Sequence, residues 1–202
     1  MSPAAATTES SDVREKILAT GQRIMGGKGF SAVGLNEVLA AAGVPKGSFY
    51  HYFGSKEAFG QAMLDAYFED YLSDMDRILV QAGGTGSQRL ENYFQAWQDN
   101  QSFEDCQGKC LAVKLGAEVA DLSESMRNAM KRGTASIVEG MSRAIEAGVA
   151  DGSVSIDQPP HEVAQSLYQL WLGASVMVKI VRDTAPFQQA MVTTRQILHL
   201  PD

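Results

Sequence analysis

Two thiols are the most reactive side chains in this chain. Cys106 and Cys110 lie four residues apart in the segment CQGKC. Two neighbouring cysteines with no others in the chain are more typical of free thiols than of a structural disulfide. Cys110 directly precedes the apolar stretch that starts at Leu111, so we expect it at a helix N-terminus, where the nucleophilic thiolate is stabilised. The alternative is that Cys110 is a small hydrophobic residue that fills space.

A lysine in an apolar helix is the second unusual feature. Lys179 lies in the segment LWLGASVMVKIVRD, with Trp171 and Ser175 at four-residue steps before it. These three residues share one face of a helix. A lysine in so apolar a run needs a partner or must extend its ammonium group to water. The alternative is that it lies near the helix C-terminus, where a cation is favoured.

A short polar segment around residue 50 carries side chains suited to DNA. The segment LNEVLAAAGVPKGSFYHYF is typical of two short helices joined by a tight turn at Gly43, the helix-turn-helix geometry. A plain helical hairpin with an aromatic core is the alternative interpretation. In a helix-turn-helix, the polar residues of the second helix donate hydrogen bonds to phosphate oxygens and base edges. The candidate DNA-binding residues are Lys46, Gly47, Ser48, Tyr50, His51 and Tyr52.

The elements that must position these side chains are predicted to be helices throughout. Apolar residues recur at helical spacing, and no segment alternates for long enough to predict a strand. We expect an all-α fold of about nine helices, over 13–28, 35–42, 45–52, 56–81, 87–102, 111–120, 123–150, 161–182 and 187–198. Asp12 is suited to cap the first helix. The predicted organisation is a flexible tail (1–11), a helix-turn-helix domain (12–56) and a sensing and dimerisation domain (57–202).

Composition and charge indicate a globular protein with a basic head. Of the 202 residues, 45% are hydrophobic and 20% are charged, and no apolar run is long enough for a membrane span. Residues 1–11 lack the features of a signal peptide, so we expect a cytoplasmic protein. The net charge is −7, yet residues 1–56 carry six basic and four acidic residues. A positive head on an acidic body is compatible with DNA binding, because only the docking face must be positive.

The string FSAVGLNEVLAAAGVPKGSFYHYFGSKEAF resembles the TetR/AcrR family of bacterial transcriptional repressors. The hallmark of that family is a glycine turn followed by Lys-Gly-Ser/Thr, an aromatic pair, Phe and Ser-Lys-Glu. The resemblance implies that the six residues above belong to the recognition helix, that Lys56 meets a phosphate, and that a homodimer binds double-stranded operator DNA. Many relatives have a capping Thr where this chain has Val33-Gly34, so we expect a weaker cap or one supplied by Asn36.

The last two predicted helices are the natural dimer interface of such a protein. The alternative is that their apolar residues bury the core of the domain itself, and the two uses are compatible on different faces. The residues concerned are Leu167, Leu170, Trp171, Ala174, Met177, Val178, Phe187, Met191, Ile197 and Leu198.

The segments GKCLAVKLGAEVADLSESMRNAM and LYQLWLGASVMVKI resemble those of NemR-type repressors, a TetR branch that senses reactive electrophiles through a cysteine. The resemblance implies that Cys110 is the sensing thiol and that Lys179 lies near it. An ammonium group favours the thiolate. Modification by a quinone, a reactive aldehyde or an oxidant would remove that pairing and shift a bistable domain. Cys106 could resolve an oxidised Cys110 as a disulfide, although we expect it to be a passenger.

Two other functions compete with covalent sensing. A non-covalent hydrophobic ligand could release the same repressor from DNA, and the alternative is that the residues of such a pocket merely fill the core. A thiol-dependent enzyme would need a catalytic motif, and the sequence has no phosphate loop, nucleophile elbow or metal-ligand set. We therefore predict no enzymatic activity, no metal and no cofactor. The candidate pocket residues are Phe94, Trp97, Met126, Met130, Tyr168, Trp171 and Met177.

Overall fold

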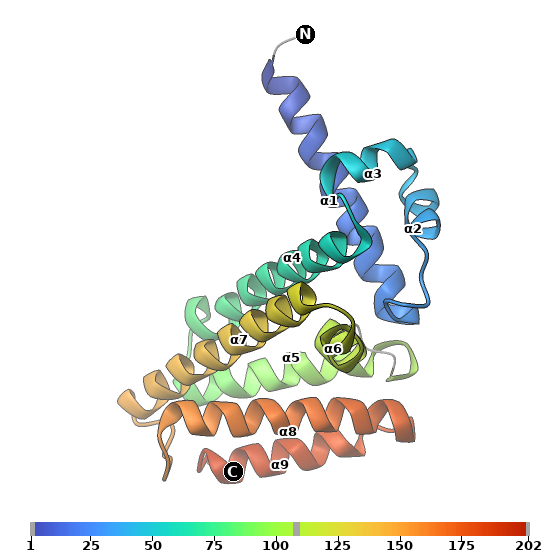
Figure 1. Ribbon diagram of the computed structural model, residues 1–202. Helices are drawn as coiled ribbons and strands as arrows, with labels where there is room; N and C mark the ends of the chain where they lie inside the picture. Colours follow the sequence, from blue (N-terminus) through green and yellow to red (C-terminus); the bar gives the residue numbers. More distant parts are fainter. Residues whose placement is uncertain (1–2, 107–109, 201–202) are drawn as a thin grey trace. The chain divides into compact units, whose positions relative to one another are not determined.

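The computed structural model describes residues 3–106 and 110–200, with side chains for 12–101 and 110–200. Across this part of the chain nine α-helices and one π-helical turn follow one another and no strand forms (Figure 1), which confirms the all-α prediction. None of the described helices combines the length and apolar character that a membrane-spanning segment needs. The elements are α1 (Pro3–Lys28), α2 (Leu35–Ala42), α3 (Lys46–Tyr52), α4 (Lys56–Asp76), η1 (Arg77–Gln81), α5 (Gly86–Cys106), α6 (Leu111–Leu122), α7 (Glu124–Ala150), α8 (Pro160–Val181) and α9 (Ala185–Ile197).

The first helix is longer than predicted, because α1 begins at Pro3 rather than after Asp12. Proline is well tolerated in the first turn of a helix, and the alanines at 4–6 have the highest helix propensity. No glycine or further proline separates them from the apolar spacing that starts at Val13. Asp12 therefore lies inside the helix and does not cap it. Its residue type suits an N-cap, but the helix continues through this position.

The chain divides into two compact units that differ from the predicted domains. Unit 1 comprises Met1–Glu69 and Lys109–Arg132, and unit 2 comprises Asp70–Gly108 and Gly133–Asp202. The predicted boundary at residue 56 marked the end of the helix-turn-helix motif. The compact unit that contains this motif includes a later segment as well. α1 packs against α6, which lies more than eighty residues further along the chain.

Around α3, the core of unit 1 is built from phenylalanine side chains that pack on one another. Phe49 is fully buried, and its ring centroid lies 5.2 Å from that of Phe53 and 5.5 Å from that of Phe59 in α4. The turn between α2 and α3 depends on Gly43, whose φ of 64° is left-handed and whose N–H bonds back to the end of α2. A glycine is favoured there because side chains rarely adopt that conformation.

The core of unit 2 is an aromatic stack across α5, α8 and α9. The ring of Trp171 is stacked between Phe94 at 4.8 Å and Phe187 at 5.7 Å between centroids. Each buried indole N–H has a hydroxyl acceptor: Trp171 donates to Thr194 Oγ1 at 2.9 Å, and Trp97 donates to Ser175 Oγ at 3.0 Å. The stack is therefore both close-packed and satisfied in its hydrogen bonds.

The predicted interface residues on α8 and α9 divide between the core and the surface. α8 and α9 lie side by side (Figure 1) and bury six of the ten predicted residues within the single chain, namely Leu167, Trp171, Ala174, Val178, Phe187 and Leu198. Met177 remains 45% exposed. The other large apolar residues exposed on these helices are Val176, Ile180 and Val181 of α8 and Val192 of α9.

Candidate DNA-binding surface and sensor thiol

The recognition helix α3 presents a polar face because one residue anchors its opposite side. Phe49 is the buried residue of this seven-residue helix. Tyr50 next to it is 52% exposed, and its ring meets that of Phe49 edge-on. Lys46, Gly47 and His51 are also exposed, while Ser48 and Tyr52 are half-buried. The exposed residues of α3 can therefore reach a DNA groove without disturbing the core.

The helix before it starts without a side-chain cap. The N-cap residue of α2 is Gly34, whose carbonyl accepts the first helical bonds from Glu37 and Val38 and which has no side chain to cap the helix. This agrees with the expectation of a weaker cap at Val33-Gly34. Val33 is fully buried, so the entry to α2 is fixed by packing and by the preceding loop.

The side chain of Lys56, which was expected to meet a phosphate, contacts Phe30 in this structure. Its ammonium donates to the carbonyl oxygen of Phe30 at 2.9 Å and lies 4.7 Å from the centroid of the Phe30 ring. The side chain is half-buried. In this structure Lys56 ties the loop after α1 to the start of α4, and its contact with DNA stays a prediction.

Two cations that the sequence analysis did not single out flank the helix-turn-helix. The guanidinium of Arg14 lies 5.6 Å from the ring centroid of Phe53, at the C-terminal end of α3. The ammonium of Lys16 lies close to Gly43 in the turn, 4.0 Å from where a Cβ on that glycine would stand. Both side chains are exposed. The sequence shows that residues 1–56 carry a positive net charge, which indicates that some of these cations face DNA. Only the packing shows which of them lie beside α3.

Cys110 occupies the N-cap of α6, as predicted. Its carbonyl accepts the first helical bond from the N–H of Lys114 at 3.0 Å. The thiol is 8% exposed, and the hydroxyl of Tyr67 donates to Sγ at 3.6 Å. A helix N-terminus and a donated hydrogen bond favour a thiolate, whereas the burial of Cys110 opposes the charged form.

The other predicted sensor residues belong to a different unit from Cys110. Lys179 is half-buried on α8, one turn after Ser175, and belongs to unit 2, whereas Cys110 belongs to unit 1. The side chain of Cys106, the last residue of α5, lies outside the described residues. The roles of both residues therefore stay predictions.

The predicted pocket residues are divided between the two units. Phe94, Trp97, Tyr168 and Trp171 pack against one another in unit 2, with the centroids of Trp97 and Tyr168 5.8 Å apart. Met126 and Met130 belong to unit 1. Met177 lies on the exposed face of α8, because a single residue step from the buried Val178 rotates its side chain about the helix. Its part in a pocket stays a prediction.

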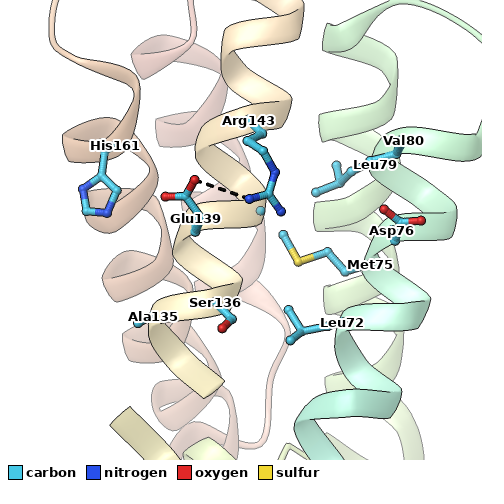
Figure 2. Close-up of a pocket in the computed structure, with 11 residues that line it drawn as sticks. Leu72, Met75, Asp76, Leu79, Val80, Ala135, Ser136, Glu139, Arg143 and His161 are labelled. Atoms are coloured by element: carbon cyan, nitrogen blue, oxygen red, sulfur yellow. Dashed lines mark hydrogen bonds and ion pairs between the residues drawn. The ribbon is translucent and has the colours of Figure 1, made fainter. Parts of the chain in front are cut away.

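A groove of about 600 Å³ lies elsewhere in unit 2 (Figure 2). Apolar residues of α4 and η1 form one wall, and α7 forms the other. On the α7 wall, Glu139 and Arg143 form an ion pair one helical turn apart, with 3.3 Å between Oε1 and Nη1. The labelled lining residues are Leu72, Met75, Asp76, Leu79, Val80, Ala135, Ser136, Glu139, Arg143 and His161.

An exposed polar helix, held at a fixed angle by buried aromatic residues behind a glycine turn, defines a helix-turn-helix DNA-binding regulator. Residues 17–63 match the family model for bacterial regulatory proteins of the tetR family, and residues 86–194 match that for the tetracyclin repressor-like C-terminal domain. The chain belongs to the TetR family of transcriptional repressors. Its relatives in this family are repressors rather than enzymes, and TetR-family regulators bind operator DNA as dimers.

Full-length relatives give the same assignment. The chain is 40% identical to the HTH-type transcriptional repressor NemR of Escherichia coli (strain K12), over 94% of this chain and 96% of that protein. It is 33% identical to the HTH-type transcriptional repressor DhaR of Mycobacterium sp. (strain GP1), over 92% of each chain. The crystal structure of the reduced form of E. coli NemR superposes with a TM-score of 0.90 at 42% identity, covering 94% of this chain and 98% of that one.

Proposed function

We propose that this repressor reads its operator through α3 and leaves it when an electrophile or oxidant modifies Cys110. The exposed side chains of Tyr50 and His51 would face the major groove, and that of Lys46 would contact a phosphate beside it. Arg14 and Lys16, which flank α3, would pair with phosphates on either side. The observation that supports the DNA-binding half is the burial of Phe49, which leaves the polar face of α3 free for DNA.

Dimerisation through α8 and α9 is supported by their exposed apolar residues. Ile180 is 67% exposed, and Val176, Met177, Val181 and Val192 are each at least 43% exposed in the single chain. Several large apolar residues exposed on two packed helices are typical of an association site. We infer that these residues, rather than the six buried ones, form the contact with a second copy.

The position of Cys110 supports its role as the sensor. The thiolate sulfur would add to an electron-poor carbon of a quinone, forming a C–S bond, and the displaced electron pair of the quinone would take up a proton from solvent. The similar structure of E. coli NemR is of its reduced form, which supports a redox-active role for a protein of this kind. In our proposal Lys179 stabilises the thiolate, and Cys106 has no required part.

An adduct at Cys110 would disturb packing within unit 1. The sulfur is 8% exposed, so there is little free space for added atoms. The next residue, Leu111, packs against α1, where a Cβ on Gly26 would lie 3.1 Å from its Cδ2 atom. Added bulk at residue 110 must therefore displace the start of α6 from α1, the helix that packs against α2.

The test is the release of operator DNA during titration with a small quinone. Fluorescence anisotropy at fixed salt would compare wild type, Cys110→Ser and Cys106→Ser, since phosphate contacts make the affinity salt-dependent. We expect wild type and Cys106→Ser to be released and Cys110→Ser to stay bound. Equal release of wild type and Cys110→Ser would refute the Cys110 mechanism.

A second candidate is release by a non-covalent apolar ligand. The groove of Figure 2 favours this idea, because its volume and its apolar wall of Leu72, Met75 and Leu79 suit a small molecule. Such a ligand would act equally on wild type and Cys110→Ser. An Ala135→Trp substitution in the groove should then abolish the response without changing the thiol chemistry.

A further inference from the structure

One carboxylate holds the loop between α1 and α2 from a distant part of the chain. Glu118 on α6 accepts the N–H of Phe30 at 3.0 Å and the N–H of Ser31 at 2.7 Å, one bond to each of its oxygens. The acceptor lies 87 and 88 positions away in sequence from these donors. Charged acceptors make the stronger kind of hydrogen bond to backbone N–H groups.

The same peptide is held from its other side. The Phe30 carbonyl accepts the hydrogen bond from the Lys56 ammonium at 2.9 Å, and the Phe30 ring is buried. Gly29 before it has a φ of 98°, and a Cβ there would lie 3.2 Å from a Glu118 oxygen. The loop therefore lies closely against the carboxylate, with a glycine where a side chain would interfere.

This loop determines where the helix-turn-helix begins. α2 starts at Leu35, and its N-cap Gly34 supplies no side-chain bond. A helix without a local cap depends on the preceding chain for its position. α2 in turn packs against α3 through the Gly43 turn. The bonds at Glu118 therefore act on the placement of the recognition helix.

Glu118 is ionised in this arrangement. Burial opposes its charge, but hydrogen bonds from the hydroxyl and N–H of Ser31 and from the N–H of Phe30, with the charge of Lys56 nearby, lower the pKa of the carboxyl overall. The charged form is the one that accepts both backbone bonds.

We propose that Glu118 is a positioning residue for operator binding, and that α6 couples Cys110 to the recognition helix through it. Cys110 caps the N-terminus of α6, and Glu118 lies on the same helix about two turns further on. A shift of α6 at its capped end moves the carboxylate that holds the loop. The coupling rests on the proposed sensing at Cys110, whereas the positioning role stands without it.

The first test is the operator affinity of Glu118→Gln beside Asp121→Asn. Gln keeps the size of the side chain but replaces one acceptor oxygen with a donor, so one backbone N–H loses its partner. The matched control removes a charge from the same helix at an exposed position. We expect Glu118→Gln to bind at least about tenfold more weakly, because fewer molecules hold α3 in the binding geometry, and Asp121→Asn to bind like wild type. Equal affinities for the two variants would overturn the positioning role.

Hydrogen exchange keeps the test informative if the affinity changes through misfolding. The amides of Phe30 and Ser31 should exchange slowly in wild type and faster in Glu118→Gln, while amides inside α8 keep their protection. Glu118→Asp retains the charge and should recover part of both losses. Unchanged exchange at Phe30 and Ser31 in Glu118→Gln would contradict the inference.

The coupling is tested by the same amides after quinone treatment. We expect faster exchange at Phe30 and Ser31 in treated wild type and no change in treated Cys110→Ser. If quinone releases wild type from DNA but leaves these amides protected, sensing at Cys110 stands and coupling through Glu118 is wrong. If quinone does not release wild type, sensing at Cys110 is wrong, and the positioning role is judged from Glu118→Gln alone.

Discussion

Each of the two units uses a carboxylate from a distant segment to hold the start of a helix. In unit 1, Glu118 accepts two N–H groups of the loop before α2. In unit 2, Asp151 accepts the N–H of Gly86 at 2.7 Å, at the start of α5. Hydrogen bonds from the hydroxyl of Ser153 and from the N–H groups of Gly86 and Ser153 lower the pKa of Asp151, as comparable bonds do for Glu118.

The two sites differ in what supports the carboxylate. Around Asp151 the backbones themselves are in contact, since a Cβ on Gly86 would lie 2.2 Å from the Cα of Gly148. At the N-cap of α2 no backbone comes as close, since a Cβ on Gly34 would meet nothing within 4 Å. The loop before α2 is thus held by a charged acceptor, whereas the start of α5 is held by a charged acceptor and by close backbone contact as well. A contact held by charge can be released without repacking a core, which suits the part of a repressor that must change.

The largest effect on unit 2 should come from its aromatic stack. Trp171→Ala removes a fully buried side chain between Phe94 and Phe187 and leaves the hydroxyl of Thr194 without its donor. We expect a loss of about 3–5 kcal/mol in the free energy of unfolding. Urea unfolding at fixed protein concentration measures it, because a dimer's stability depends on concentration. Val149→Ala, an exposed change in the same unit, should stay within about 0.5 kcal/mol of wild type.

The contact between Gly86 and Gly148 can be tested by adding one methyl group. Gly86→Ala forces backbone to move, so we expect a loss of about 1–3 kcal/mol in the free energy of unfolding. Gly83→Ala lies in the same break, where a Cβ would meet nothing within 4 Å. Thermal unfolding of both variants compares them directly, and equal midpoints would show that the close approach does not support α5.

Removing one cation from α3 should weaken DNA binding without regard to sequence. Lys46→Ala loses one phosphate contact, so the slope of log K against log salt should fall by about 1. Anisotropy titrations at several salt concentrations, with operator and unrelated DNA, measure this slope. Lys114→Ala, an exposed change on α6, is the control. Equal slopes for both variants would indicate a long-range charge effect rather than a contact by α3.

The smallest predicted effect is the pH dependence of stability, which should differ between the Glu118 hydrogen bonds and the Trp171 packing. Because the pKa of Glu118 lies below its ordinary value of 4.5 in the folded protein, its contribution to stability is complete above pH 4.5 and is lost as the pH falls through the lowered pKa. The difference in unfolding free energy between wild type and Glu118→Gln should therefore shrink in acid. The loss from Trp171→Ala should stay constant over the same range, and a parallel decline of both would contradict the comparison.

Much of the site could be predicted from sequence because its signals are local. The string around Gly43 and Lys46 predicted the turn and the polar face of α3, since both depend on residues within a few positions of one another. Cys110 was placed at a helix N-terminus because an apolar run begins directly after it. Helical spacing and glycine breaks likewise located the later helices to within a few residues.

Tertiary structure alone decided which distant groups meet. No local pattern links Glu118 to Phe30, brings Lys56 to the Phe30 carbonyl, or makes segment 110–132 part of unit 1. The sequence made Trp171 and Met177 alike candidates for the pocket and the dimer interface, but packing against α5 and α9 decided that the first is buried and the second exposed. The physical reason is range: caps, turns and periodicity are properties of neighbouring residues, whereas burial and pairing depend on segments that only folding brings together.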